Sequence, residues 1–268
     1  MNNLDKLTET VNRSGFPLQI GLINRIHKTG ESLGWKVLCA EHAWRNEADH
    51  ASGFIDIVLE DRYLTSVLVV ECKRVLETSW VFLVDDPRYK ERNHAKLWVT
   101  NVRTGNTKHF DWFDATLDPP SPESAFCVVL GQDAKSRPML ERVASDIVSA
   151  TEAVAAEEQK LIRGEIDALR MYGSVVVTTA ALKICSFAPE NISLNDGKVA
   201  EPHFTEVPYV RFRKQLSVRS PNRKSLAANM LGAAAKAKEH TVFVVNASAF
   251  EQFLKEWEVS INSLGPLM

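Results

Sequence analysis

Residues 53–75 read GFIDIVLEDRYLTSVLVVECKRV, and most of what can be predicted about the fold follows from this deciding stretch. A charged turn at its centre separates two apolar runs, which predicts two consecutive β-strands. The second run is apolar at successive positions, as expected of a strand that is buried on both faces of a sheet. Charged side chains nevertheless interrupt both runs: Asp56 stands in the first, and Glu71 and Lys73 stand in the second.

These three side chains indicate a functional cluster, because a charge in a buried strand is costly unless it is paired or binds a metal. Side chains alternate along a strand, so Glu71 and Lys73 share one face and Cys72 points to the other. Asp56 on the adjacent strand would complete the cluster. Two carboxylates can hold Mg²⁺ beside a phosphate, and the lysine can orient or deprotonate a water. The other interpretation is a structural ion-pair network at a sheet edge.

The remaining pattern predicts an α/β protein with helices on the faces of a sheet, because the chain runs helix, three strands, helix, strand. The region at 77–137 is less regular, contains the break Pro119-Pro120-Ser121-Pro122 and indicates an insertion. A doubly wound nucleotide-binding fold is disfavoured, because the sequence has no GxGxxG or GxxxxGK[ST] loop. Helices are predicted at 17–34, 138–161, 222–238 and 247–259, and strands at 35–43, 53–59, 64–75, 97–102, 125–130, 172–187, 209–216 and 241–245.

Length and composition suit one large domain or a core with an appended subdomain, since the chain has 268 residues, 45% hydrophobic and 25% charged. The four cysteines show no paired metal-ligand spacing and are expected to be reduced, buried thiols. His42, His50 and His94 share no zinc-ligand spacing. No signal peptide and no membrane-spanning apolar run is present. We therefore expect a soluble, cytoplasmic protein.

A basic segment at 207–238 is conspicuous in a chain whose net charge is −2. It contains eight basic residues and no Asp or Glu, and affinity for a polyanion must come from such a local region. We expect this segment to contact the phosphate backbone of nucleic acid; a solvated face is the other interpretation. The expected contacts are Arg211, Arg213, Lys214, Arg219, Arg223 and Lys224.

The order and spacing of these motifs resemble the PD-(D/E)XK nuclease superfamily, and within it a bacterial restriction-endonuclease-like group. Asp56 follows Ile55, fourteen residues intervene, and Glu71-Cys72-Lys73 follows. The predicted helix ends in Gly34-Trp35, and Trp80-Val81-Phe82 comes after the motif. The resemblance covers residues 16–83, and more weakly continues to 187. Isoleucine replaces the superfamily's proline before the aspartate.

The resemblance implies a restriction-endonuclease-like core with a mixed sheet at 16–188, including an insertion at about 77–137. A lead-in at 1–15 precedes it, and an α/β extension at 189–268 packs on it. The implied activity is Mg²⁺-dependent hydrolysis of phosphodiester bonds, with Mn²⁺ as a substitute. DNA is favoured over RNA and endonucleolytic cleavage over exonucleolytic. The implied role is bacterial defence against foreign DNA.

In this reading Asp56 and Glu71 bind the metal, and Lys73 positions or activates water. Many relatives carry a glutamate on the leading helix, where this chain has Gln19, and Glu41 is the other candidate for an accessory ligand. Two alternatives stay open: a catalytically silent relative that binds nucleic acid or protein, and a phosphatase or nucleotide hydrolase with the same metal chemistry. A homodimer or a separate targeting protein would be the partner.

Overall fold

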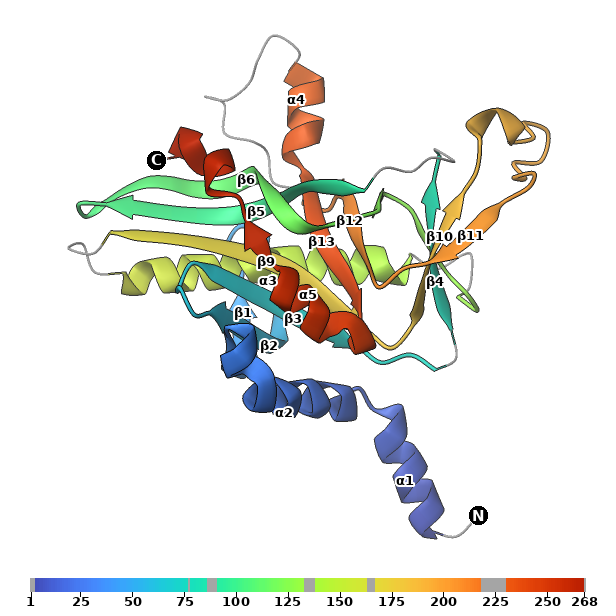
Figure 1. Ribbon diagram of the computed structural model, residues 1–268, viewed down its shortest axis with the longest axis horizontal. Helices are drawn as coiled ribbons and strands as arrows, with labels where there is room; N and C mark the ends of the chain where they lie inside the picture. The colour runs from blue at the N-terminus through green and yellow to red at the C-terminus, as the bar shows by residue number, and fades with distance from the viewer. Residues whose placement is uncertain are drawn as a thin grey trace.

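The computed structural model describes residues 3–76, 78–85, 91–132, 138–162, 167–217 and 230–267. The chain is a mixed α/β protein with a 10-stranded mixed sheet and a second, 4-stranded sheet (Figure 1). Among the helices in these ranges, none is long and apolar enough to cross a membrane.

The described ranges contain five α-helices, and the second shows clearly why its sequence forms a helix. Pro17 lies in its first turn, where a missing N–H costs nothing. Gly34 ends it in the left-handed conformation at φ +76°, which glycine adopts without strain. The predicted helix at 17–34 is confirmed. The helices are α1 Asn3–Arg13, α2 Phe16–Leu33, α3 Met139–Leu161, α4 Met230–Ala237 and α5 Phe250–Glu256, with 3-10 turns at Pro189–Asn191, Ala247–Ala249 and Ile261–Leu267.

The main sheet contains both strands predicted within residues 53–75 and the strand predicted directly before them. Its strands are β1 Trp35–Arg45, β2 Ser52–Asp61, β3 Ser66–Lys73, β5 Arg92–Arg103, β6 Asn106–Ser121, β7 Glu123–Ser124, β9 Ala168–Thr178, β12 Tyr209–Gln215, β13 Glu239–Asn246 and β14 Glu258–Val259. The strands β1, β2 and β3 pair antiparallel in that order. After α3 the chain returns as β9, which lies parallel to β3.

Strand β9 is the centre of the main sheet. One of its edges pairs with β3 along Met171 to Thr178. The other edge is shared, because β5 pairs with its first half and β13 with its second half. The sheet order is β1-β2-β3-β9-β13-β12-β7, and β5, β6 and β14 extend it from the first half of β9.

The second sheet has the strand order β11-β10-β4-β8. Its strands are β4 Ser79–Val84, β8 Cys127–Val129, β10 Ala181–Ser186 and β11 His203–Glu206. Trp80 and Phe82 of β4 are fully buried in the same apolar cluster as α3. This small sheet therefore covers part of the face of the main sheet that α3 also covers.

The two faces of the main sheet have separate apolar cores. One core joins α3 and the small sheet to the side chains on one face. The other joins α2 and α5 to the opposite face, with Leu22, Ile26 and Phe253 buried in it. Figure 1 shows α5 in front of the central strands, α3 behind them and α2 below them, while α1 projects away from the body. None of the residues of α1 is buried.

The predicted insertion at 77–137 is more regular than its sequence indicated. Much of it is the long antiparallel hairpin β5–β6, which joins the main sheet through β9. The expected break at Pro119-Pro120-Ser121-Pro122 is confirmed only at its end, since β6 continues through Pro119 and Pro120 and stops at Ser121, directly before Pro122. The prolines fall within an irregularity of the pairing, where the register passes from His94↔Thr116 to Arg92↔Ser121. Prolines are tolerated there because few ladder N–H donors are needed.

Two later predictions also need correction. The single strand expected at 172–187 is two strands, β9 and β10, which belong to different sheets. The closing helix expected at 247–259 is a 3-10 turn followed by α5 and the short strand β14. The Ala-rich helix expected at 222–238 is described only from Met230, because residues 218–229 lie outside the described residues.

Candidate active site

Three neighbouring strands set three acidic residues at adjoining positions of the sheet. In the β1–β2 pairing Ala40 lies opposite Ile57 and His42 opposite Ile55, which sets Glu41 opposite Asp56. The β2–β3 pairing ends at Ile57 and Val70, one position before Asp56 and Glu71. Asp56 on β2 therefore lies between Glu41 on β1 and Glu71 on β3.

Where β2 and β3 stop pairing, the side chain of Asp56 supplies the acceptor that a backbone carbonyl of the neighbouring strand would otherwise provide. The backbone N–H of Cys72 donates to Asp56 Oδ2 over 2.6 Å. This bond favours the charged carboxylate, as does the positive charge of Lys73. Burial acts in the opposite direction and outweighs both, and Glu41 adds repulsion, so the pKa of Asp56 is raised.

Glu71 and Lys73 share the face of β3 that looks toward α3, as strand alternation predicts, and Cys72 is buried in the core on the other face. Lys73 Nζ lies 2.5 Å from Glu71 Oε1, and both side chains remain partly exposed. Burial raises the pKa of Glu71, and the negative charge of Asp56 raises it further, while Lys73 lowers it. The single ammonium of Lys73 thus faces the carboxylates of Glu71 and Asp56, and the cluster carries a net negative charge when both are ionised.

Gln19 links helix α2 to this row. Its side chain is only 5% exposed. Nε2 donates to Glu41 Oε1 over 2.5 Å and to the backbone oxygen of Asp56 over 3.0 Å. The amide thus acts as a donor that positions Glu41, and this geometry supports a positioning role better than a ligand role.

The backbone of Glu41 has φ +53°, the left-handed region that residues other than glycine seldom occupy. Such strain persists only where the surrounding structure maintains it, and it concentrates at functional sites. No pattern in the sequence marks this conformation. The carboxylate of Glu41 accepts the hydrogen bond from Gln19, and because Glu41 is exposed, the rest of its side chain remains open to solvent.

A divalent cation fits the donor chemistry of this cluster in part. Asp56 and Glu71 offer two hard carboxylate oxygens, and Mg²⁺ commonly binds through one or two carboxylates while water and phosphate oxygens complete its shell. Within the described ranges, no group of three Asp, Glu, His or Cys side chains is arranged to hold one ion. The protein alone would therefore supply two ligands.

A cavity of about 280 Å³ opens beside the cluster, and we call it the site cavity. Glu71 and Lys73 form one wall, the first residues of β2 form another, and α3 forms the third. Asp146 of α3 lines it and raises the pKa of Glu71 through its negative charge. No sequence pattern singles out Asp146, because it lies on the exposed side of a helix far along the chain from Glu71.

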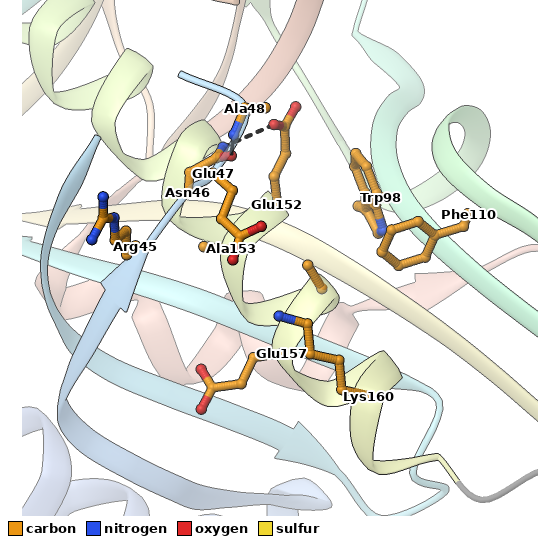
Figure 2. Close-up of a pocket in the computed structure, with 11 residues that line it drawn as sticks. Arg45, Asn46, Glu47, Ala48, Trp98, Phe110, Glu152, Ala153, Glu157 and Lys160 are labelled. Carbon is orange, nitrogen blue, oxygen red and sulfur yellow. Dashed lines mark hydrogen bonds between the residues drawn. The ribbon is translucent and has the colours of Figure 1, made fainter. Parts of the chain in front are cut away.

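A second cavity, of about 360 Å³, lies between the end of β1, helix α3 and the aromatic side chains of Trp98 and Phe110, as Figure 2 shows. Its buried carboxylate, Glu152, accepts hydrogen bonds from Asn46 Nδ2 at 3.0 Å and from Trp112 Nε1 at 2.8 Å. Asn46 also donates to Ser149 Oγ at 3.0 Å. These contacts fasten the loop onto α3, and Glu152 has a structural role.

The predicted phosphate contacts of the basic segment are largely used inside the protein. Arg211 is fully buried, and its guanidinium donates to the backbone oxygens of Leu117 and Pro119 and to Ser121 Oγ over 2.6–2.8 Å. Burial lowers its pKa to about 10. The expectation that Arg211 contacts a phosphate is corrected accordingly, because the side chain cannot reach solvent.

The other members of the segment are ion-paired or lie outside the described residues. Arg213 pairs with Asp114 over 2.8 Å and with Glu239 over 3.4 Å. Lys214 pairs with Glu141 of α3 and lies over the ring of Phe126. The expected contacts outside the described residues are Arg219, Arg223 and Lys224.

Comparisons with models of protein families, with curated proteins and with solved structures gave no significant match.

Proposed function

We propose that this chain is a metal-dependent nuclease that hydrolyses phosphodiester bonds, with DNA favoured as substrate. One observation carries the proposal: Asp56 and Glu71 lie at adjoining positions where β2 and β3 part, with the ammonium of Lys73 beside Glu71 and with Glu41 of β1 acting on Asp56. Two raised carboxyl pKa values in one cluster are typical of functional sites. A structural ion-pair network would balance its charges, and this row does not.

The topology supports the same proposal. Helix α2, the antiparallel strands β1 to β3, helix α3 and the parallel strand β9 follow the order of a restriction-endonuclease-like core. The acidic residues lie at the position where β2 and β3 part, which leaves room for a substrate group between the strand ends. The second sheet and the β5–β6 hairpin are additions to that core.

Each side chain has a separate role in the proposed reaction. Asp56 and Glu71 would hold Mg²⁺ or Mn²⁺, which supplies a Lewis acid that activates water and offsets negative charge on the phosphate. As an ammonium, Lys73 would orient the attacking water and face the phosphate with its positive charge; only as a neutral amine would it accept the proton of the water. Gln19 holds Glu41 in place through the hydrogen bond to its carboxylate.

A substrate panel tests the proposal. The purified chain is incubated with plasmid, linear duplex, single-stranded DNA, RNA and nucleotides, with Mg²⁺, Mn²⁺ or EDTA. We expect metal-dependent cleavage of a polynucleotide, reduced about 10²–10⁴-fold in Lys73→Ala. Lys36→Ala is the matched control, because Lys36 forms the same kind of pair with Glu60, over 2.7 Å, away from the cluster. Equal activity of the Lys73→Ala variant and the wild type would refute the assignment.

A second candidate is a catalytically silent nucleic-acid- or protein-binding module. The observation that favours it is the donor role of Gln19, which leaves two protein ligands for a metal. Calorimetry with Mg²⁺ and Mn²⁺ separates the two candidates. A silent module should bind neither ion at this cluster, and its heat of mixing should be the same in Asp56→Asn.

A further inference from the structure

The site cavity has a chemical character that differs from the carboxylate row beside it. Its inner wall is formed by the buried side chains of Ile55 on β2 and of Val143, Ile147 and Ala150 on α3. An apolar wall offers no hydrogen bonds to a phosphate, and a phosphate there would lose its solvation without compensation. The cavity is therefore suited to a weakly solvated group.

The mouth of the cavity adds an aromatic side chain. Phe54 lines it and is 67% exposed, whereas the other cavity aromatic, Trp44, is largely buried. An exposed phenylalanine beside a groove for nucleic acid is a surface on which a base can stack, because every base has a π-face. Single exposed apolar residues are common on proteins, so the position of Phe54 at this mouth is what gives it weight.

The opposite wall is the proposed catalytic pair, Glu71 and Lys73. A group that occupies the cavity is thus adjacent to the phosphate that these residues would attack. In a polynucleotide the flat group nearest to a phosphate is the base of the adjoining nucleotide. At about 280 Å³ the cavity is smaller than the roughly 300–1,000 Å³ of pockets for drug-sized ligands, which suits one base.

We propose that the site cavity receives the base next to the scissile phosphate, so that the substrate is single-stranded or locally unpaired nucleic acid. This inference rests on the proposed nuclease function. A base inside a duplex is stacked and paired, and its removal from the stack has an energetic cost that single strands avoid. The cavity therefore favours single strands, frayed ends or mismatched positions over intact duplex.

Asp146 indicates which bases fit. A carboxylate accepts hydrogen bonds and donates none when ionised. Adenine, cytosine and guanine carry exocyclic amino groups that donate, whereas thymine and uracil flank their ring N–H with two acceptor carbonyls. A base with an amino group should therefore be preferred beside the cleaved bond.

The cavity is held open by its surroundings. Ser149 Oγ of α3 donates to Asp49 Oδ2 over 2.7 Å, and Asn46 Nδ2 donates to the same hydroxyl. These bonds fix the loop that leads into β2, and with it the wall around Phe54. A preformed pocket loses less conformational entropy on binding than one that must be ordered.

Cleavage mapping of single-stranded oligonucleotides tests the inference. One base at a time is replaced by an abasic residue, and the cut positions are read at single-nucleotide resolution with Mg²⁺ or Mn²⁺ present. We expect cleavage at the bond adjoining the abasic residue to fall about tenfold, since one stacked base contributes roughly this factor. Intact duplex should be cut more slowly than the same strand alone.

Two variants assign the effect to the cavity. Phe54→Ala should reduce kcat/KM for single strands and weaken the abasic effect, while Tyr63→Ala, which removes an equally exposed aromatic at 75% exposure in the turn after β2, should not. Asp146→Asn should reduce discrimination between cytosine and thymine at the cut. Its metal dependence is measured in parallel, because Asp146 also affects Glu71.

The outcomes separate the two levels of the proposal. Metal-dependent cleavage that ignores abasic residues and base identity, or that is as fast on duplex as on single strands, overturns the base pocket and leaves the nuclease in place. No cleavage of any polynucleotide overturns the nuclease function and the pocket together.

Discussion

Asp56 has two opposite effects on stability, and two substitutions separate them. Its carboxylate is partly buried near other carboxylates, which destabilises the charged form. The same carboxylate accepts the Cys72 N–H, a backbone donor that would otherwise lack its partner. Asp56→Asn removes the charge and keeps an oxygen in place, whereas Asp56→Ala removes both.

The magnitude follows from the hydrogen bond. A buried N–H left without an acceptor costs about 1–3 kcal/mol. We therefore expect Asp56→Ala to unfold with a free energy about 1–3 kcal/mol lower than that of Asp56→Asn. Asp56→Asn should be at least as stable as the wild type at pH 7 without metal. Charge repulsion alone would predict that Asp56→Ala is stabilised as well.

Urea denaturation followed by tryptophan fluorescence at pH 7 with EDTA measures the three free energies of unfolding. Unchanged m-values confirm that the variants differ in stability rather than in the surface exposed on unfolding. If Asp56→Ala and Asp56→Asn unfold at the same urea concentration, the Cys72 hydrogen bond contributes nothing and the reasoning fails. Both variants should lose Mg²⁺ binding by calorimetry.

Four further outcomes are expected. The pKa values of Asp56 and Glu71 are raised, so the folded state holds these protons more tightly than the unfolded state does. The free energy of unfolding of the wild type, relative to that of the double variant Asp56→Asn, Glu71→Gln, should therefore fall as the pH rises above about 4, the ordinary carboxyl range. Parallel urea titrations from pH 4 to 8 check this sign. Gln19→Glu sets a carboxylate against Glu41 and removes two donated hydrogen bonds, so the melting temperature should fall without metal and partly recover with Mg²⁺, as scanning calorimetry would show. Glu41→Gly relieves the φ of +53° and should leave stability within about 1 kcal/mol while weakening Mg²⁺ binding, measured by titration. Arg211→Gln should lower the free energy of unfolding by at least about 3 kcal/mol, since three charge-assisted hydrogen bonds are lost. A variant that is as stable as the wild type and whose DNA binding depends less steeply on salt would instead show that Arg211 contacts phosphate.

The deciding stretch and the leading helix were predictable because local signals and tertiary packing agree there. Pro17 and Gly34 mark the ends of α2, and the charged residues of β2 and β3 stand out against apolar neighbours. The clustering of Asp56 with Glu71 needed only strand alternation and the pairing of consecutive strands. The row of Glu41, Asp56 and Glu71 was therefore accessible from the sequence, although its chemistry stays a proposal.

The features that the sequence does not predict depend on contacts between distant parts of the chain. A count of charges does not distinguish a solvated arginine from Arg211, whose partners are carbonyl groups of β6. The change from β9 to β10 at Thr179 and Ala180 has no glycine, proline or asparagine to mark it. The φ of Glu41 and the position of Asp146 beside Glu71 follow from packing alone.

The central position of β9, with β3 on one edge, limits how this protein can be truncated. A fragment that ends at residue 162 would contain Gln19, Glu41, Asp56, Glu71 and Lys73, yet it would lack the strand that pairs with β3 from Ser66 to Lys73. The backbone that carries Glu71 and Lys73 would then become an open sheet edge, which invites pairing with other chains. During synthesis the same gap persists until the ribosome has released β9, and β13 completes the neighbouring half later still. Truncations meant to isolate a minimal catalytic unit should therefore extend through Asn246, and shorter ones should aggregate rather than lose activity in a soluble form.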